Sequence, residues 1–206
     1  MINGEKPSIL IATNNVGKLA EFERLLSDDY QIDGLAGLNL ELPAEGTTSY
    51  KENAEAKAVF VAAASGRLTL GDDSGIEARV LGGAPGIVSA RYAGEPVSDS
   101  RNIEKLLTEI DAQDYSDRAA RFVCWLALAD AKGLIASVVG TCEGQIGFEP
   151  VGTNGFGYDP VFLFPSGLTM AELSETQKDE ISHRGNAVRA MMPVLARAVS
   201  QAAGNA

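Results

Sequence analysis

Residues 120–142, ARFVCWLALADAKGLIASVVGTC, decide the kind of sheet that this chain builds. Two apolar runs, 120–130 and 134–142, flank the short turn Lys132-Gly133, and this pattern predicts a long antiparallel hairpin. The first run is apolar on both of its faces, as is typical of a strand that is covered on both sides. We therefore expect residues 120–130 to form a central strand.

The segments around this hairpin predict further strands and helices. Short strands are expected at 8–13, 31–38 (weak, running into a loop), 67–72 and 159–164. Helices are expected at 14–27, 49–64, 98–110 and from 182 onward, the last bent at Pro193. The order lacks strict βαβ alternation, so we predict a mixed sheet flanked by helices, an α/β fold in a single domain over 1–206.

Composition excludes several classes of protein. A chain of 206 residues with 45% hydrophobic residues suits one globular domain, and no apolar run approaches the roughly 20 residues of a membrane span. The N-terminus lacks the layout of a signal peptide, so we expect a cytoplasmic protein without a membrane partner. The two cysteines, Cys124 and Cys142, are expected to be reduced core residues. A net charge of −11 argues against a nucleic-acid surface, but it allows a small anion in a local basic pocket.

The stretch ATNNVGK (12–18) places a lysine just inside a predicted helix. The strand is expected to end at Thr13 and the helix to open near Asn15, and a helix N-terminus favours anions. Lys18 lies one turn into the helix, within reach of a phosphate. The alternative is an ordinary helix cap with a solvated lysine, because the stretch is not a Walker A loop.

Two adjacent acids, Asp72 and Asp73, follow the apolar run 68–70 and precede Ser74-Gly75. Carboxylates at a strand end can bind Mg²⁺, which prefers oxygen ligands, and can activate a water for attack on phosphorus. The alternative is a turn, for which Asp-Ser-Gly is well suited. These local residues do not decide between a metal site and a turn.

Three further segments are ambiguous when each is read separately. Glu45 and Lys57 are surface charges in one interpretation. In the other, the Lys57 side chain points from the helix 49–64 into a pocket. In TNGFGYDP (153–160), Phe156 or Tyr158 either stacks on a planar base or packs in the core. His183 and Arg184 occupy the first turn of the last helix, where cations are unfavourable unless a ligand needs them. Together with Lys178, these groups suit a nucleoside triphosphate with Mg²⁺ better than a sugar or a peptide.

In its motifs, the chain resembles the inosine/xanthosine triphosphate pyrophosphatases, the family that acts on non-canonical purine nucleoside triphosphates. The resemblance runs from about residue 8 to residue 197. It rests on Thr13-x-Asn15-x-x-Lys18, Glu52-Asn53-Ala54-x-x-Lys57-Ala58, Asp72-Asp73-Ser74-Gly75, LGGAPGIVSARYAG (81–94), Gly155-Phe156-Gly157-Tyr158-Asp159-Pro160 and Ile181-Ser182-His183-Arg184-Gly185.

This resemblance implies hydrolysis of ITP, dITP and XTP to the monophosphate and pyrophosphate, dependence on Mg²⁺, two lobes with a central substrate cleft, and a homodimer. It implies that Asp73 is the proton acceptor and a metal ligand and that Glu45 is a second metal-site acid. The implied substrate contacts are the phosphate loop Thr13, Asn14, Asn15, Val16, Gly17 and Lys18, the side chains of Ser74, Lys57 and Lys178, and the base pocket of Phe156, Gly157, Tyr158, Asp159, His183 and Arg184.

Two other functions remain open from the sequence. One is a related pyrophosphatase for other altered nucleotides, such as modified pyrimidines, which a substrate panel separates. The other is a nucleotide sensor without turnover, which the acid pair disfavours because binding alone needs no water-activating carboxylate.

Overall fold

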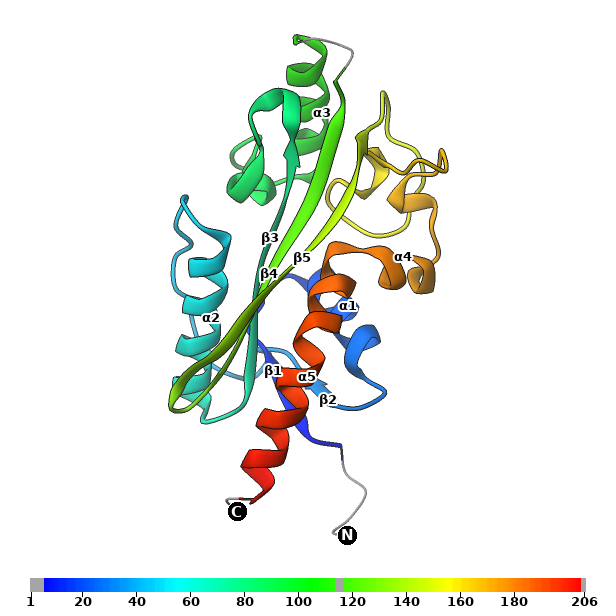
Figure 1. Cartoon of the computed structure of the whole chain (residues 1–206). Coiled ribbons are helices and arrows are strands. Elements are labelled where there is room, and N and C mark those ends of the chain that lie inside the picture. Colours follow the sequence, from blue (N-terminus) through cyan, green and yellow to red (C-terminus); the bar gives the residue numbers. More distant parts are fainter. Residues whose placement is uncertain (1–5, 114–116, 205–206) are drawn as a thin grey trace. The chain divides into compact units, whose positions relative to one another are not determined.

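The computed structural model describes residues 6–113 and 117–204 of the chain. Figure 1 labels the main elements, which follow one another along the chain. The strands are β1 (Ser8–Ile11), β2 (Gln31–Asp33), β3 (Thr69–Ala78), β4 (Ala119–Asp130), β5 (Gly133–Ile146) and β6 (Phe162–Leu163). The α-helices are α1 (Val16–Leu26), α2 (Tyr50–Ser65), α3 (Asp99–Asp111), α4 (Glu175–Ile181) and α5 (His183–Gly204).

The strands form a six-stranded mixed sheet in the order β2-β1-β3-β4-β5-β6. Strand β1 pairs in parallel with β2 and with β3, with Leu10 opposite Thr69 in the second pairing, whereas β5 and β6 are antiparallel. Strand β4 has a neighbour on each side, so the predicted central position of residues 120–130 is confirmed. The prediction of a mixed sheet with helices is confirmed as well.

Two predicted strands differ from the structure, and one helix was not predicted. Strand β3 does not end at residue 72 but continues to Ala78, so Asp72 and Asp73 lie in the middle of a strand. The predicted strand at 159–164 is reduced to β6, because Asp159–Val161 form a 3₁₀ turn. Helix α4 was not predicted. Ser174 caps it in a capping box: the Ser174 hydroxyl accepts from the backbone N–H of Gln177, and the backbone N–H of Ser174 donates to the Gln177 side chain.

Contacts along the chain divide it into two compact units. Unit 1 comprises residues 1–73, 125–140 and 187–206, and unit 2 comprises residues 74–124 and 141–186. Strands β3, β4 and β5 each contribute residues to both units.

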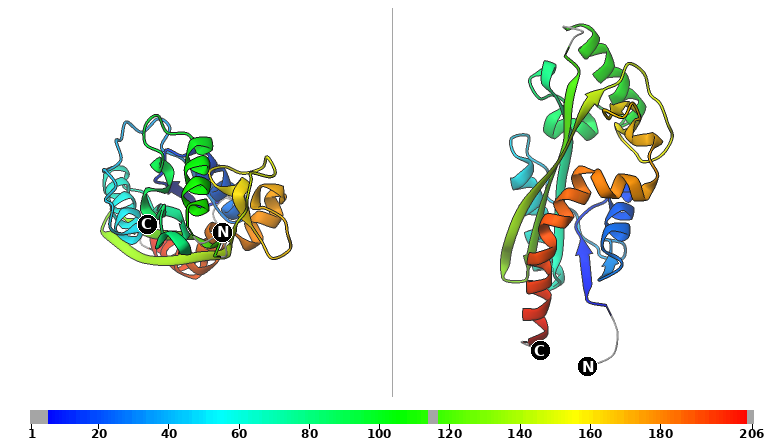
Figure 2. Two further views of the ribbon diagram at one scale, coloured as in Figure 1. Left: turned by 90° about the horizontal axis from the view of Figure 1, so that it is seen from above. Right: turned by 45° about the vertical axis from the view of Figure 1, so that its right-hand side comes forward.

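One cluster in the core of unit 1 consists of small side chains. Figures 1 and 2 show α1 and α2 on opposite sides of the strands of this unit. Helix α2 contributes Ala54, Ala58 and Ala62 to a buried cluster that also contains Ala127 and Ala129 of β4. A Cβ atom built on Gly71 of β3 would lie 2.4 Å from the backbone oxygen of Ala54. The helix therefore approaches the strand backbone more closely than any larger residue at position 71 allows.

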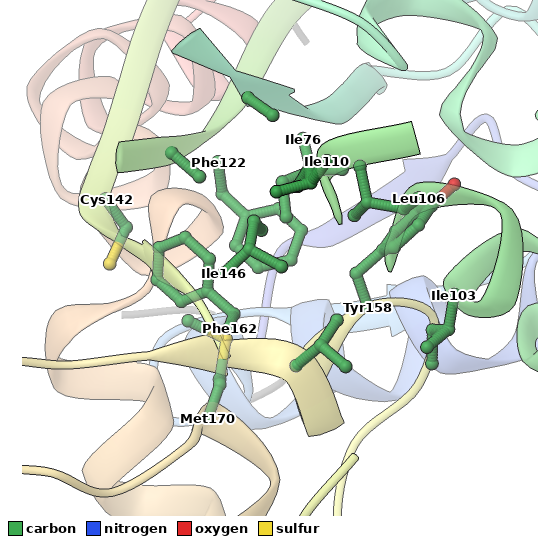
Figure 3. Close-up of a cluster of buried hydrophobic side chains, with 13 residues drawn as sticks. Ile76, Ile103, Leu106, Ile110, Phe122, Cys142, Ile146, Tyr158, Phe162 and Met170 are labelled. Atoms are coloured by element: carbon green, nitrogen blue, oxygen red, sulfur yellow. The ribbon is translucent and has the colours of Figure 1, made fainter. Parts of the chain in front are cut away.

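Unit 2 has a core of larger side chains, shown in Figure 3. Ile103, Leu106 and Ile110 of α3 gather there with Phe122 of β4 and with Phe162 of β6. The predicted helix at 98–110 is confirmed, because α3 spans Asp99–Asp111 with Ser98 as its cap. The cysteines are also as predicted, since Cys124 and Cys142 are buried and are not joined in a disulfide.

Candidate active site

The acid pair lies in the middle of β3, where successive side chains point to opposite faces of the strand. Asp72 forms an ion pair with Lys18 of α1, with 3.0 Å between Oδ2 and Nζ. Asp73 instead contacts residues of α2. Both acids are buried, at 1% and 5% exposure. The turn that the sequence also allowed at this position is therefore excluded.

Two side chains of α2 contact the Asp73 carboxylate, and each of them also contacts the loop of Glu45 and Gly46. Its Oδ2 accepts a hydrogen bond of 2.8 Å from Asn53 Nδ2, and its Oδ1 lies 3.8 Å from Lys57 Nζ. Lys57 Nζ also donates to Glu45 Oε1 at 2.6 Å. Gly46, which follows Glu45, exchanges two backbone hydrogen bonds with the Asn53 side chain. The structure thus brings Glu45, Lys57 and Asp73 together, although they come from three separate segments.

Lys57 is buried at 5% exposure, so it is not the surface charge that one interpretation of the sequence allowed. Burial by itself lowers the pKa of this ammonium group, but the nearby carboxylates of Asp72, Asp73 and Glu45 outweigh burial and raise the pKa. Lys57 therefore remains a cation at neutral pH, and it is held among acids in a place where an anionic ligand can use its charge.

Burial also raises the pKa of the Asp73 carboxyl group. Lys57 and the hydrogen bond from Asn53 act in the opposite direction, and the charge of Glu45 acts in the same direction as burial. A carboxylate with a raised pKa is a better proton acceptor than an exposed aspartate. This environment suits Asp73 for work as a general base.

The N-terminus of α1 has the geometry that the sequence predicts. Asn15 caps the helix and accepts a hydrogen bond of 2.9 Å from the backbone N–H of Lys18. Thr13 is buried, and its Oγ1 accepts from the backbone N–H of Asn15 at 3.1 Å. Asn14, Asn15 and Val16 are exposed, Val16 to 81%. This loop therefore presents the positive end of a helix and the Lys18 side chain in unit 1.

A divalent cation has a limited set of donors in this part of the molecule. Within residues 6–113 and 117–204, no group of three or more His, Cys, Asp or Glu side chains is arranged to hold a metal ion. Mg²⁺ is usually bound through one or two carboxylates together with substrate phosphates and waters. The ion pairs here join three carboxylates to two lysines, which leaves one negative charge in excess; the residues are Asp72, Asp73 and Glu45 with Lys18 and Lys57. Asp73 and Glu45 therefore fit Mg²⁺ that arrives with a nucleotide, but not an ion caged by protein ligands alone.

A second group of predicted residues assembles in unit 2 around Phe156. Lys178 is buried and forms an ion pair with Asp159, and its Nζ lies 5.0 Å from the centre of the Phe156 ring. The Asp159 carboxylate also accepts from the backbone N–H of Phe156 at 2.9 Å. Gly155 has φ of +75°, and a Cβ atom there would lie 1.9 Å from Asp159 Oδ2, so only glycine fits this turn.

Arg184 and His183 lie at the start of α5, as predicted, and both side chains are buried. Arg184 Nη2 donates to Ser74 Oγ at 3.0 Å, and its guanidinium lies 5.9 Å from the Phe156 ring. The His183 imidazole stacks on Phe122 with 4.6 Å between ring centres and 11° between planes. The Arg184 and His183 side chains are therefore held in fixed orientations within unit 2.

The two aromatic residues of the glycine-rich loop have different environments. Tyr158 is a core residue, and its hydroxyl donates to the backbone oxygen of Ser89 at 2.8 Å. Gly157, between the two, donates its backbone N–H to Asp99. Phe156 is only partly buried. Because Tyr158 packs in the core, Phe156 is the better candidate of the two for stacking on a base.

Sequence reasoning did not assign a site role to two residues that the structure places against predicted ones. Asn53 contacts Asp73, and Phe122 contacts His183. The spacing of Asn53 from Lys57 on one helix was a usable signal, because residues four apart lie on the same face. Phe122 had no such signal, since its contact with His183 spans distant parts of the chain.

These features define an α/β protein of mixed sheet in which buried carboxylates and lysines suit a ligand that carries phosphate. The chain belongs to the Ham1 family, whose model matches residues 9–194.

Relatives and solved structures agree with this membership. A dITP/XTP pyrophosphatase of Shouchella clausii is 46% identical over 89% of this chain and 93% of its own length. One of Exiguobacterium sibiricum is 47% identical over 91% of this chain and 96% of its own. Among solved structures, a HAM1 protein from Coxiella burnetii is 39% identical with a TM-score of 0.82, covering 93% and 99% of the two chains. The Staphylococcus aureus Ham1 protein is 41% identical with a TM-score of 0.79, covering 91% and 97%.

Proposed function

We propose that this protein hydrolyses non-canonical purine nucleoside triphosphates, ITP, dITP and XTP, to the monophosphate and pyrophosphate. The relatives named dITP/XTP pyrophosphatase are similar over nearly their whole length, and this supports the activity. The single observation that carries the proposal is the buried Asp73 carboxylate, with Lys57 and Asn53 beside it and Glu45 on the same lysine. A protein that only binds nucleotides has no need of such a proton acceptor.

The proposed reaction is an in-line attack by water on the α-phosphorus. Asp73 takes the proton from the water as the new phosphorus–oxygen bond forms. The bond to the β-phosphate oxygen breaks at the same time, and pyrophosphate leaves. Lys18 and Lys57 neutralise charge on the phosphate oxygens, and the N-terminus of α1 contributes its backbone dipoles.

Asp73 and Glu45 are the proposed ligands of Mg²⁺, whose chemistry when bound is to withdraw charge from phosphate oxygens. Asp72 has a supporting role in this proposal. Its pairing with Lys18 holds that lysine close to β3, and its charge helps to keep Lys57 protonated.

The residues of unit 2 are proposed to bind the purine. Phe156 stacks on the base, and such stacking contributes about 1–3 kcal/mol per base. Arg184 and His183 donate hydrogen bonds toward the 6-oxo group. Adenine carries a 6-amino donor at this position, and a buried donor that faces another donor is unfavourable. Lys178 contacts both Asp159 and the Phe156 ring, so we assign it to this group of residues.

We further propose that the enzyme works as a homodimer in the cytoplasm, where it removes altered nucleotides before polymerases use them. No helix within residues 6–113 and 117–204 combines the length and apolar character needed to cross a membrane. Light scattering coupled to gel filtration measures the number of subunits directly, and a monomeric mass contradicts the dimer.

Release of pyrophosphate from dITP with Mg²⁺ is the experiment that tests the proposed function. ITP, XTP, GTP, ATP and modified pyrimidine triphosphates complete the panel. We expect turnover of dITP, ITP and XTP far above that of ATP. If the protein turns over none of these nucleotides, the proposal that it is an enzyme is wrong. If it prefers a modified pyrimidine triphosphate, the proposed substrate class is wrong.

A further inference from the structure

Asn53 connects the two acids proposed to bind the cation. It lies in the first turns of α2, and only 6% of the residue is exposed. Its Nδ2 donates to Asp73 Oδ2 at 2.8 Å and to the backbone oxygen of Gly46 at 3.1 Å. Its Oδ1 accepts from the backbone N–H of Gly46 at 2.8 Å. One side chain thus bridges β3 and the loop residue that follows Glu45.

Chemistry decides the orientation of this amide. The backbone N–H of Gly46 can only donate, so it must face the amide oxygen, and the amide nitrogen then faces Asp73. Among the side chains of similar size, aspartate offers no donor at neutral pH and leucine offers no polar atom. Asparagine therefore matches both neighbours at once.

We propose that Asn53 is a positioning residue that holds Asp73 and the loop of Glu45 in the arrangement that binds a divalent cation and nucleotide. The role rests on the proposed function of these two acids. The hydrogen bond to Asp73 Oδ2 fixes the rotation of the carboxylate. The two bonds to Gly46 fix the loop, which carries Glu45 within 2.6 Å of Lys57. Lys57 in turn contacts Asp73, so the five residues form a closed set of contacts.

A positioning role differs in its consequences from a purely structural one. Residues that orient metal ligands through hydrogen bonds typically change metal affinity or activity by about 10–100-fold when they are replaced. A buried asparagine that only satisfies backbone groups affects stability instead. The two roles are therefore separable by measuring the cation requirement and stability of the same variants.

Asn102 of α3 is a matched control in unit 2. It is 2% exposed, and its side chain also bridges a loop, donating to the backbone oxygen of Ala90 at 3.0 Å and accepting from the N–H of Ala93 at 2.8 Å. The proposed reaction gives it no role. Asn102→Ala thus reproduces the loss of two buried backbone contacts without touching an acid of the proposed site.

The test compares the full-length wild type with Asn53→Ala, Asn53→Asp and Asn102→Ala. We measure the Mg²⁺ concentration for half-maximal pyrophosphate release from ITP, together with kcat and KM. Binding of Mn²⁺ without nucleotide, followed by electron paramagnetic resonance, and hydrogen exchange of the Gly46 amide are independent of turnover. Thermal unfolding shows which variants fold; Asn53→Asp keeps the size of the side chain and carries the test if Asn53→Ala does not fold.

For the Asn53 variants we expect the half-saturating Mg²⁺ concentration to rise by about 10–100-fold and kcat to fall, with weaker Mn²⁺ binding. In Asn53→Ala the Gly46 amide exchanges faster. Asn102→Ala lowers the unfolding temperature but leaves the Mg²⁺ requirement unchanged. Equal Mg²⁺ requirements in the Asn53 and Asn102 variants overturn the proposal, as does unchanged Gly46 exchange in Asn53→Ala. A wild type that binds Mn²⁺ but releases no pyrophosphate contradicts the proposed function alone, and the Mn²⁺ and exchange measurements still decide the role of Asn53.

Discussion

Asp73 combines burial with polar neighbours that keep it usable as a carboxylate. Burial alone favours the neutral acid, whereas Lys57 and Asn53 stabilise the charge. Asp72 is next to it in sequence but faces Lys18, so the two acids have different partners and different proposed roles.

Replacing Asp73 by asparagine tests the proton acceptor. The amide keeps the size of the side chain and can still accept from Asn53, but it cannot take a proton from water. We expect kcat for ITP to fall by about 10²–10⁴-fold, the usual contribution of general-base catalysis. The matched control is Asp72→Asn, which we expect to lower kcat less. Near-normal turnover in a folded Asp73→Asn protein contradicts the assignment.

Phe156 and Arg184 contribute to base recognition in different ways in our proposal. Any purine can stack on Phe156, so Phe156→Ala lowers kcat/KM for ITP and ATP by similar factors. Arg184→Ala lowers kcat/KM for ITP much more than for ATP, because Arg184 offers donors that match only a 6-oxo group. A mismatched buried donor is unfavourable by about 1–3 kcal/mol, which corresponds to a change in the ITP/ATP ratio of about 5–150-fold.

Steady-state pyrophosphate release with both nucleotides measures these ratios. Arg184 also donates to Ser74, so Ser74→Ala shows how far the ITP/ATP ratio changes when this contact is lost and the arginine remains. If Arg184→Ala does not change the ratio of kcat/KM for ITP to that for ATP, other groups determine selectivity, such as His183 or the backbone of 156–159.

At the scale of elements, the close approach of α2 to β3 is what brings Asn53 and Lys57 to Asp73. Alanines at positions 54, 58 and 62 of α2 pack with Ala127 and Ala129. Gly71 has no Cβ atom that would clash with the backbone of the helix. The alanine-rich composition of this helix is thus a requirement of the proposed site as well as of the packing.

Gly71→Ala is expected to separate these two elements. The added Cβ would lie 2.4 Å from Ala54 O and 2.7 Å from Ala58 N, and backbone atoms cannot rotate away from it. We expect a loss of about 1–3 kcal/mol in the free energy of unfolding, together with a fall in kcat. Chemical denaturation and ITP turnover measure the two effects. Gly147→Ala is the control, because its Cβ would meet nothing closer than 3.6 Å; equal stability of the two variants contradicts the argument.

At the scale of the whole molecule, three strands contribute to both compact units. If one unit unfolds, its part of β3, β4 and β5 unfolds with it, and the other unit contains the rest of the same strands. We therefore expect the two units to unfold in a single cooperative transition, as the prediction of one domain over 1–206 requires.

The chain offers one natural probe for each unit. Trp125, the only tryptophan, belongs to unit 1, and His183, the only histidine, belongs to unit 2. Trp125 fluorescence and the His183 imidazole resonances should give the same midpoint in urea. Midpoints that differ beyond error indicate two independently folding domains and contradict the single-domain prediction.

Local patterns in the sequence were sufficient for much of the fold. The apolar run at 120–130 predicted an internal strand, and the pattern of residues 98–110 predicted the helix that the structure has as α3. Such signals work because the repeat of a strand or a helix places neighbouring residues on one face. The end of β3 was predicted wrongly, because Asp-Asp-Ser-Gly is typical of turns when tertiary partners are not known.

The sequence by itself determined the types of residue available for chemistry and, through its motifs, the family. Only the tertiary structure decided which of these residues meet. Asn53 and Lys57 both contact Asp73 because α2 packs closely on Gly71. Tyr158 packs in the core, where its hydroxyl donates to Ser89. These contacts join residues far apart in the chain, and local propensity carries no information about them. Their free energy comes from burial and from pairing of charges, which exist only after the chain has folded.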